Sequence, residues 1–207
     1  MPFTYNVVTG ASADRLEKLI GERLAPGADK AAIDRRIWRL FGEKWAVLYT
    51  DLSGFSRNVA EFGIVHFLQT IQESHRLLVP IIERENGILL KTEGDSMIVM
   101  FRHVSDAVRC AVNMQKCTQE YNLTRIDAEK VLLCVGIGYG EMLRIGDSDI
   151  FGAEVNAACK LGEDTAKAHE ILVTGEVSRV ARFPPNTSLQ PLDTTPAGAD
   201  SAFKLIY

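Results

Sequence analysis

Residues 45–56 of this chain read WAVLYTDLSGFS, and the organisation of the fold follows outward from this stretch. Its first part, from Ala46 to Tyr49, is a short apolar run bounded by turn signals, which predicts a buried strand. The strand leads into a loop that carries Asp51 and Gly54, and the loop opens a helical region. Because backbone N–H groups at a helix start can bind phosphate oxygens, this order of elements is suited to a polyphosphate ligand.

Short apolar runs and helical periodicity alternate through the rest of the main domain. The expected elements are a helical region over 57–85, strands over 88–92 and 97–101, a helix over 104–121, a strand over 131–139, a turn with a short strand over 140–151, a helix from 153, a strand over 170–174, an exposed loop over 182–199 and an edge strand over 202–207. This mixed order predicts an α/β fold of the α+β sandwich type.

The N-terminal part of the chain differs from the rest. Residues 1–44 are predicted to form a helical arm, and residues 45–207 form the main domain. Within the arm, one helical pattern stops at Pro26 and a second amphipathic pattern stops at Gly42. We expect the arm to pack on the main domain or on a partner.

The composition limits the classes of function that the chain can have. A chain of 207 residues with 46% hydrophobic residues fits one globular domain with a short appendage. The net charge of −4 argues against a broad nucleic-acid interface. No apolar run is long enough to span a membrane, and the N-terminus lacks the pattern of a secretory signal. The four cysteines form no CxxC pair, so free thiols in a cytoplasmic protein are expected.

Two aspartates occupy positions that suit metal binding. Asp51 follows a buried strand, and Asp95 lies in the tight hairpin 93–96 between two predicted strands. Carboxylates held on rigid backbone at one edge of a sheet can bind Mg²⁺, which takes few protein ligands and leaves room for phosphate oxygens. Turn chemistry explains either aspartate when it is considered alone.

Four segments of the main domain resemble, in order and spacing, the class III adenylate/guanylate cyclase catalytic domain. They are YTDLSGFS at 49–56, KTEGD at 91–95, VGIGYGE at 135–141 and DIFGAEVN at 149–156. The resemblance extends from Val47 to about Val173. It implies a ferredoxin-like nucleotide cyclase fold, with a central, mostly antiparallel sheet and flanking helices.

The resemblance also implies roles for residues of the first two segments. Asp51 and Asp95 are expected to bind two Mg²⁺ or Mn²⁺ ions, with the Leu52 carbonyl as an additional ligand. The backbone amides of the following loop are expected to hold the distal phosphates of the substrate; that loop contains Gly54, Phe55 and Ser56.

A second group of residues is implied to act on the nucleoside. Lys91 and Asp149 match the positions that read the base, and Asn156 matches the residue that positions the ribose. Adenine offers an acceptor at N1 and a donor at N6, which suits a lysine that only donates and an aspartate that only accepts. In this family the site spans a head-to-tail homodimer, so one chain supplies the metal ligands and the other supplies this second group.

Two departures from the family pattern stand out. Lys160 occupies the place where the family usually has an arginine that stabilises charge on the transferring phosphate. Lysine keeps the charge but loses the forked geometry of arginine. Near the C-terminus, residues 194–198 (TTPAG) stand where the family often has a phosphate-binding lysine in a glycine-rich turn.

The sequence therefore favours a homodimeric adenylate cyclase that converts ATP into 3′,5′-cyclic AMP and pyrophosphate, with Asn156 and Lys160 as catalytic residues. One alternative is a cyclase that uses GTP, CTP or UTP. Another is a catalytically weak nucleotide-binding module that has kept the fold, which the lysine at position 160 favours slightly.

Overall fold

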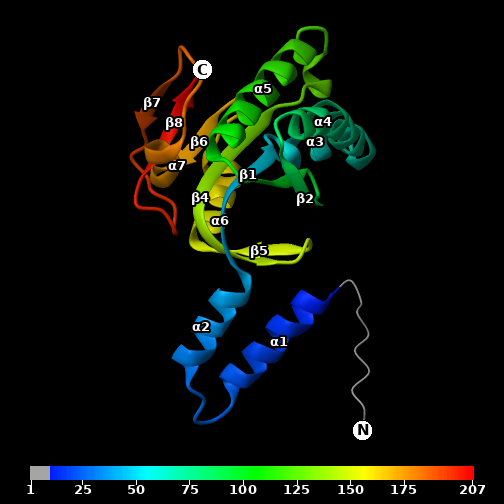
Figure 1. Ribbon diagram of the computed structural model, residues 1–207. Helices are drawn as coiled ribbons and strands as arrows, with labels where there is room; N and C mark the ends of the chain where they lie inside the picture. Colours follow the sequence, from blue (N-terminus) through cyan, green and yellow to red (C-terminus); the bar gives the residue numbers. More distant parts are fainter. Residues whose placement is uncertain (1–9) are drawn as a thin grey trace.

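A computed structural model describes residues 10–207, without the side chains of residues 55–58. Within this range one mixed sheet is covered by helices on both faces (Figure 1). The strands are β1 Gly42–Leu52, β2 Ile88–Glu93, β3 Ser96–Phe101, β4 Leu133–Ile145, β5 Asp149–Phe151, β6 Ile171–Thr174, β7 Ser188–Pro191 and β8 Ala202–Ile206. The expected α+β sandwich is confirmed.

The strands are ordered β2-β3-β1-β4-β6-β8-β7, and β5 pairs with β4 beside this path. Among residues 10–207 the β4–β6 pair is parallel and the other pairs are antiparallel, so the expected mostly antiparallel sheet is confirmed. The long strands β1 and β4 form its centre, with Leu48 opposite Ile137. Because β1 neighbours β3, the end of β1 lies beside the β2–β3 hairpin.

The helices divide between the two faces of the sheet. They are α3 Phe55–Phe62, α4 Ile64–Arg84, α5 Val104–Asn122, α6 Ala153–Lys160 and α7 Gly175–Val180, with a 3₁₀ turn over Asp127–Glu129 and a π-helical turn, η2, over Leu161–Thr165. One core joins the sheet to α4, α5 and α7, and includes Leu78, Val108 and Val177. A second core on the opposite face packs α6, through Val155 and Ala158, against the sheet.

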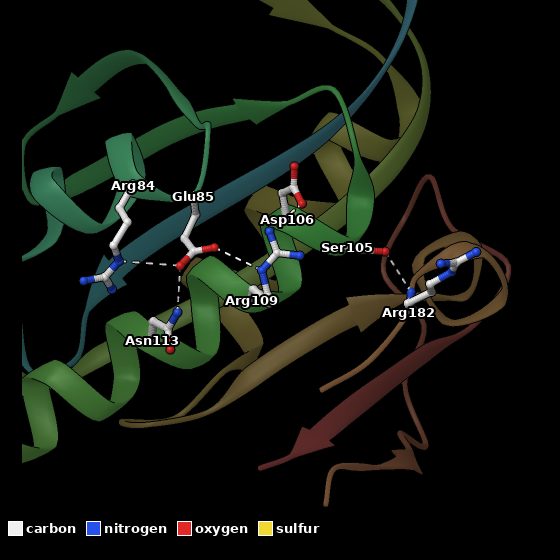
Figure 2. Close-up of polar contacts among 7 residues, drawn as sticks. All are labelled: Arg84, Glu85, Ser105, Asp106, Arg109, Asn113 and Arg182. Atoms are coloured by element: carbon white, nitrogen blue, oxygen red, sulfur yellow. Dashed lines mark hydrogen bonds and ion pairs between the residues drawn. The ribbon is translucent and has the colours of Figure 1, made fainter. Parts of the chain in front are cut away.

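Polar contacts fix α5 to its neighbours on the first face (Figure 2). The buried Glu85 carboxylate, at the end of α4, accepts hydrogen bonds from Arg109 (3.0 Å) and Asn113 (2.9 Å) of α5. At the start of α5, the Ser105 hydroxyl accepts a hydrogen bond of 2.9 Å from the Arg182 backbone, just after α7. A buried carboxylate needs such partners, so these contacts tie three helices into one layer.

The arm consists of two antiparallel helices, α1 Ala11–Leu24 and α2 Lys30–Phe41, as the sequence predicts (Figure 1). Asp29 caps α2 by accepting a hydrogen bond of 3.0 Å from the Ala32 amide. A small core, which includes Leu19 and Ile37, packs against Ile145 at the end of β4. Residues 1–9 lie outside the described residues, and the division at residue 44 stays a prediction, since β1 begins directly after α2.

Four expectations about element boundaries are wrong. The strand expected over 46–49 is longer, because β1 pairs with β4 over its whole length and includes Asp51. The helical region over 57–85 is two helices, because Gly63 adopts a φ of 85° that a helix does not allow. The strand expected over 131–139 continues to Ile145, since its second half pairs with the start of β1. The loop over 182–199 contains β7, so β8 lies inside the sheet and β7 forms the edge, where Pro191 is tolerated.

Two predictions from composition can also be compared with the structure. The four cysteines are free as expected, and each is buried or half-buried. No helix within residues 10–207 is long and apolar enough to cross a membrane.

Candidate active site

The two predicted metal-binding aspartates meet at one edge of the sheet. Asp51 is the penultimate residue of β1, and Asp95 lies in the β2–β3 hairpin. The backbone amide of Leu52 favours the ionised form of both carboxylates and so lowers the pKa of each. Asp51 Oδ1 also accepts a hydrogen bond of 3.3 Å from Ser96, a residue that the sequence analysis did not single out although it directly follows Asp95.

The pair carries negative charge that the described side chains do not neutralise. Burial raises the pKa of Asp51 to about 6, and the charge of Asp95 adds to this rise. Burial also raises the pKa of Asp95. Asp95 Oδ2 is buried and has no hydrogen-bond partner among the described residues, and neither aspartate forms an ion pair with a described side chain. Two such carboxylates fit the hard oxygen ligands that Mg²⁺ and Mn²⁺ prefer.

The set of protein ligands is small. Within the described residues no group of three or more His, Cys, Asp or Glu side chains could hold a metal ion. Magnesium sites that also bind phosphates commonly use only one or two carboxylates. Asp51 and Asp95 therefore suit a metal ion shared with a nucleotide, and the Leu52 carbonyl remains an expected further ligand.

The predicted phosphate loop follows the aspartate directly. Gly54 precedes α3 with a φ of 92°, a left-handed conformation that favours glycine. Phe55 and Ser56 form the start of α3 by their backbone, and their side chains lie outside the described residues. The first amides of a helix have no partner inside the helix, so this end of α3 can donate to phosphate oxygens.

The two predicted base-reading residues form an ion pair. Lys91 Nζ on β2 lies 3.1 Å from Asp149 Oδ1 on β5 and 2.7 Å from Glu93 Oε1. The hydrogen bond to Glu93, followed by that to Asp149, raises the pKa of Lys91. Residues that are distant in the sequence thus present a donor and an acceptor side by side. Glu93 is an additional neighbour that the sequence analysis did not predict.

The predicted catalytic residues are exposed on α6, one turn apart. Asn156 Nδ2 donates a hydrogen bond of 2.8 Å to the Ala197 carbonyl, in the segment that replaces the family's glycine-rich turn. Lys160 Nζ lies 2.7 Å from Asp164 Oδ2. Both side chains are therefore engaged within the chain, though at the surface, where a substrate can compete for them.

Three alternate glycines of β4, at positions 136, 138 and 140, allow α6 to lie very close to the sheet. A Cβ on Gly136 would overlap the Ala158 carbonyl oxygen, and one on Gly138 would overlap the Glu154 carbonyl oxygen. Glu154 anchors the helix because its Oε2 accepts hydrogen bonds from the Tyr139 amide (3.0 Å) and the Thr174 hydroxyl (2.7 Å). Sequence reasoning missed Glu154, although the alternation of glycines signals a close helix–strand contact.

The site residues fall into two groups. Within the described residues, no hydrogen bond or ion pair joins Asp51 or Asp95 to the group formed by Lys91, Asp149, Asn156 and Lys160. One group suits metal and phosphate, and the other suits a base, a ribose and a developing charge.

The fold and this arrangement define a nucleotide cyclase domain. Residues 42–196 match the family described as the adenylate and guanylate cyclase catalytic domain, and the chain belongs to that family. Its members bind nucleoside triphosphates, generally use divalent metal ions and often dimerise. The class III cyclase resemblance of the sequence is confirmed.

Three relatives illustrate the match. The structure of an adenylate/guanylate cyclase/hydrolase from Silicibacter pomeroyi is 26% identical, with a TM-score of 0.67, and the match covers 80% of this chain and 98% of that one. A putative adenylate cyclase 3 of Rhizobium meliloti is 28% identical over 116 residues, which are 56% of this chain and 20% of that protein. A serine/threonine-protein kinase, pkn2, of Myxococcus xanthus is 26% identical over 132 residues, 64% of this chain and 16% of that protein. The chain thus matches at most a fifth of the length of these two curated relatives.

Proposed function

We propose that this domain converts ATP into 3′,5′-cyclic AMP and pyrophosphate, working as a homodimer with two Mg²⁺ or Mn²⁺ ions at each site. The observation that carries the proposal is the half-buried Asp51–Asp95 pair: Asp95 has an oxygen without a hydrogen-bond partner among the described residues, and a helix starts shortly after Asp51. Carboxylates with uncompensated charge beside free amides suit a metal–polyphosphate complex.

The reaction requires one substitution at phosphorus. The ribose 3′-hydroxyl releases its proton to solvent, its oxygen forms a bond to the α-phosphorus, the bond from the α-phosphorus to the bridging oxygen breaks, and pyrophosphate leaves. When bound, divalent ions supply charge neutralisation and activation of the attacking oxygen. The chain positions the substrate: the amides of residues 54–56 hold the distal phosphates, Asn156 orients the ribose, and Lys160 donates to the α-phosphate as negative charge develops.

The Lys91–Asp149 pair supports adenine as the base. The lysine can donate to N1 and the aspartate can accept from N6, and their separation of 3.1 Å supports binding of both groups along one edge of a base. Guanine presents the reverse pattern there. A mispaired buried polar group costs about 1–3 kcal/mol, so two of them give strong discrimination.

The separation of the site residues into two groups supports a shared site. Two chains arranged head to tail would bring the carboxylates of one chain to the base-reading pair and Asn156 of its partner. When a two-fold axis relates the two chains, this arrangement creates two equivalent sites. The four free cysteines suit a reducing compartment, so we place the reaction in the cytoplasm.

One observation favours a second candidate, a catalytically weak nucleotide-binding module. The Asn156 amide is held by the Ala197 carbonyl, and Lys160 is paired with Asp164. A chain in which these two contacts persist would bind the nucleotide without fast turnover. The complete set of metal-binding and base-reading residues supports the enzyme instead.

The deciding experiment compares the four ribonucleoside triphosphates. The protein is incubated with each one and Mg²⁺ or Mn²⁺, and the cyclic product is identified by mass spectrometry. The proposal expects cyclic AMP to dominate, and it expects no product from Asp51→Ala. A different dominant cyclic nucleotide would overturn the base assignment, whereas nucleotide binding without any cyclic product would support the weak module.

A further inference from the structure

Two buried hydroxyl groups form a chain of hydrogen bonds that ends on Asp51. Tyr49 lies on β1 and is 8% exposed, and Ser96 begins β3 and is 5% exposed. The Tyr49 hydroxyl lies 3.0 Å from Ser96 Oγ, which lies 3.3 Å from Asp51 Oδ1. An ionised carboxylate only accepts hydrogen bonds, so Ser96 donates its single proton to Asp51 and Tyr49 donates to Ser96.

The other side of Tyr49 contacts the helical layer that carries the catalytic residues. A Cβ on Gly162, in the η2 turn, would lie 2.8 Å from the Tyr49 ring, so glycine is needed for this close approach. Glu163 of the same turn places Oε2 3.5 Å from the Tyr49 hydroxyl. The η2 turn directly continues α6, the helix of Asn156.

Resting on the proposed function, we infer that Tyr49 and Ser96 are positioning residues that orient the Asp51 carboxylate for a divalent ion. Hydrogen bonding at Oδ1 fixes the plane of the carboxylate and directs its other oxygen. Because both hydroxyls are buried, water cannot readily replace either one. Partners of this kind commonly change metal affinity by about 10–100-fold.

Tyr49 also links two parts of the site. Its hydroxyl acts through Ser96 on Asp51, which acts on one substrate. Its ring packs against Gly162 of η2, which continues α6, and in the proposed dimer α6 acts on the other substrate. Docking of α6 on the sheet and orientation of the metal-binding carboxylate therefore depend on the same tyrosine.

The test measures binding of Mn²⁺ alone, without nucleotide, by electron paramagnetic resonance and calorimetry. Tyr49→Phe and Ser96→Ala should each weaken Mn²⁺ binding about tenfold. Because the hydroxyls act in series, the double variant should bind no more weakly than Ser96→Ala. Ser96→Thr, which keeps a hydroxyl, should restore most of the affinity.

Matched controls lie outside the site. Ser74→Ala removes a buried hydroxyl that donates to the Ile71 carbonyl on α4, and Tyr121→Phe removes a hydroxyl from a half-buried ring on α5. Both controls should bind Mn²⁺ like the unmodified chain, and thermal unfolding should show that all variants remain folded.

Asp51→Ala separates failure of the inference from failure of the proposed function. If this variant binds Mn²⁺ normally, the carboxylates do not hold the metal, and the proposed function fails with the inference. If Asp51→Ala loses binding while Tyr49→Phe and Ser96→Ala keep normal affinity, the positioning role alone is overturned. If the double variant binds Mn²⁺ more weakly than Ser96→Ala does, the two hydroxyls do not act in series, and this result would also contradict the inference.

Discussion

The Asp51 carboxylate combines two opposing requirements, since a metal-binding group must be ionised and burial disfavours the ionised form. Its pKa of about 6 in the folded chain stands above the ordinary value of 3.8. The folded protein therefore binds this proton more readily than the unfolded chain does. The contribution of Asp51 to the stability of the metal-free protein consequently falls as pH rises from about 4 to 6, and stays low above that range.

The raised pKa of Asp51 gives a prediction for the Asp51→Asn variant. The amide cannot ionise, so the variant should lose cyclase turnover and yet have a higher Tm than the unmodified chain at pH 8 with a metal chelator present. The gain should vanish near pH 4, where the folded chain already holds the proton. Scanning fluorimetry across this pH range, with cyclase assays, provides the measurement. Asp193→Asn, at an exposed aspartate, is the control, and near-normal turnover of Asp51→Asn would refute the metal-binding role.

Lys160 gives the second prediction at this scale. Its ion pair with Asp164 is about half exposed on both sides, and exposed pairs of this kind are weak, so a substrate phosphate can take the lysine. Lys160→Ala should lower kcat by about 10²–10³ and change KM little, by analogy with the loss of one oxyanion donor. Lys160→Arg should preserve or raise kcat, because arginine adds an oriented donor.

Steady-state kinetics on two further variants sharpen this test. Asp164→Asn releases the lysine from its ion pair and should leave kcat unchanged or higher. Lys167→Ala removes an exposed lysine a few residues later and should have no effect. An unchanged kcat in Lys160→Ala would leave Lys160 as a surface residue.

At the scale of elements, the sequence predicts what depends on local pattern and misses what depends on pairing across the sheet. The core of the strand that leads to Asp51 and the hairpin around Asp95 were predicted because apolar runs and turn residues mark them. The extension of β4 and the existence of β7 were missed, because each depends on pairing with another strand, β1 for the end of β4 and β8 for β7. Glu154, Tyr49 and Ser96 were missed for the same reason, since their partners come from other strands.

The close contact between β4 and α6 gives a prediction of its own. Gly138→Ala places a Cβ on the Glu154 carbonyl, so the helix must move or the strand must bend. We expect a loss of about 1–3 kcal/mol in the free energy of unfolding, typical of overpacking, together with reduced turnover because Asn156 moves with α6. Urea denaturation measures the first effect and cyclase assays measure the second.

Gly21→Ala is the matched control for this experiment. Gly21 lies within α1 and has open space where a Cβ would stand, so alanine there should stabilise the helix or have no effect. A Gly138→Ala variant as stable and active as the Gly21→Ala variant would show that α6 tolerates displacement from the sheet.

For the whole molecule, the arrangement of the two groups of site residues decides how the domain can act. The carboxylates lie where β1 ends beside the β2–β3 hairpin, whereas Asp149 lies on β5, beside the end of β4 on which the arm packs (Figure 1). Within the described part of one chain no hydrogen bond or ion pair joins the carboxylates directly to the second group, and the proposed head-to-tail dimer would bring the two groups together at two sites. If the site is shared, a substitution in either group inactivates a homodimer. A mixed dimer of two variants that are substituted in different groups keeps one intact site.

Subunit mixing tests this directly. Asp51→Ala and Asn156→Ala should each be inactive alone, because each homodimer lacks the same group at both sites. Random exchange makes half of the dimers mixed, and each mixed dimer has one intact site, so an equal mixture should recover about a quarter of the unmodified activity. Asp51→Ala mixed with Asp95→Ala is the control: both lesions lie in the carboxylate group, so every site in every dimer lacks one carboxylate and no activity should return. If labelled subunits exchange and the Asp51→Ala and Asn156→Ala mixture stays inactive, the site is not shared between chains.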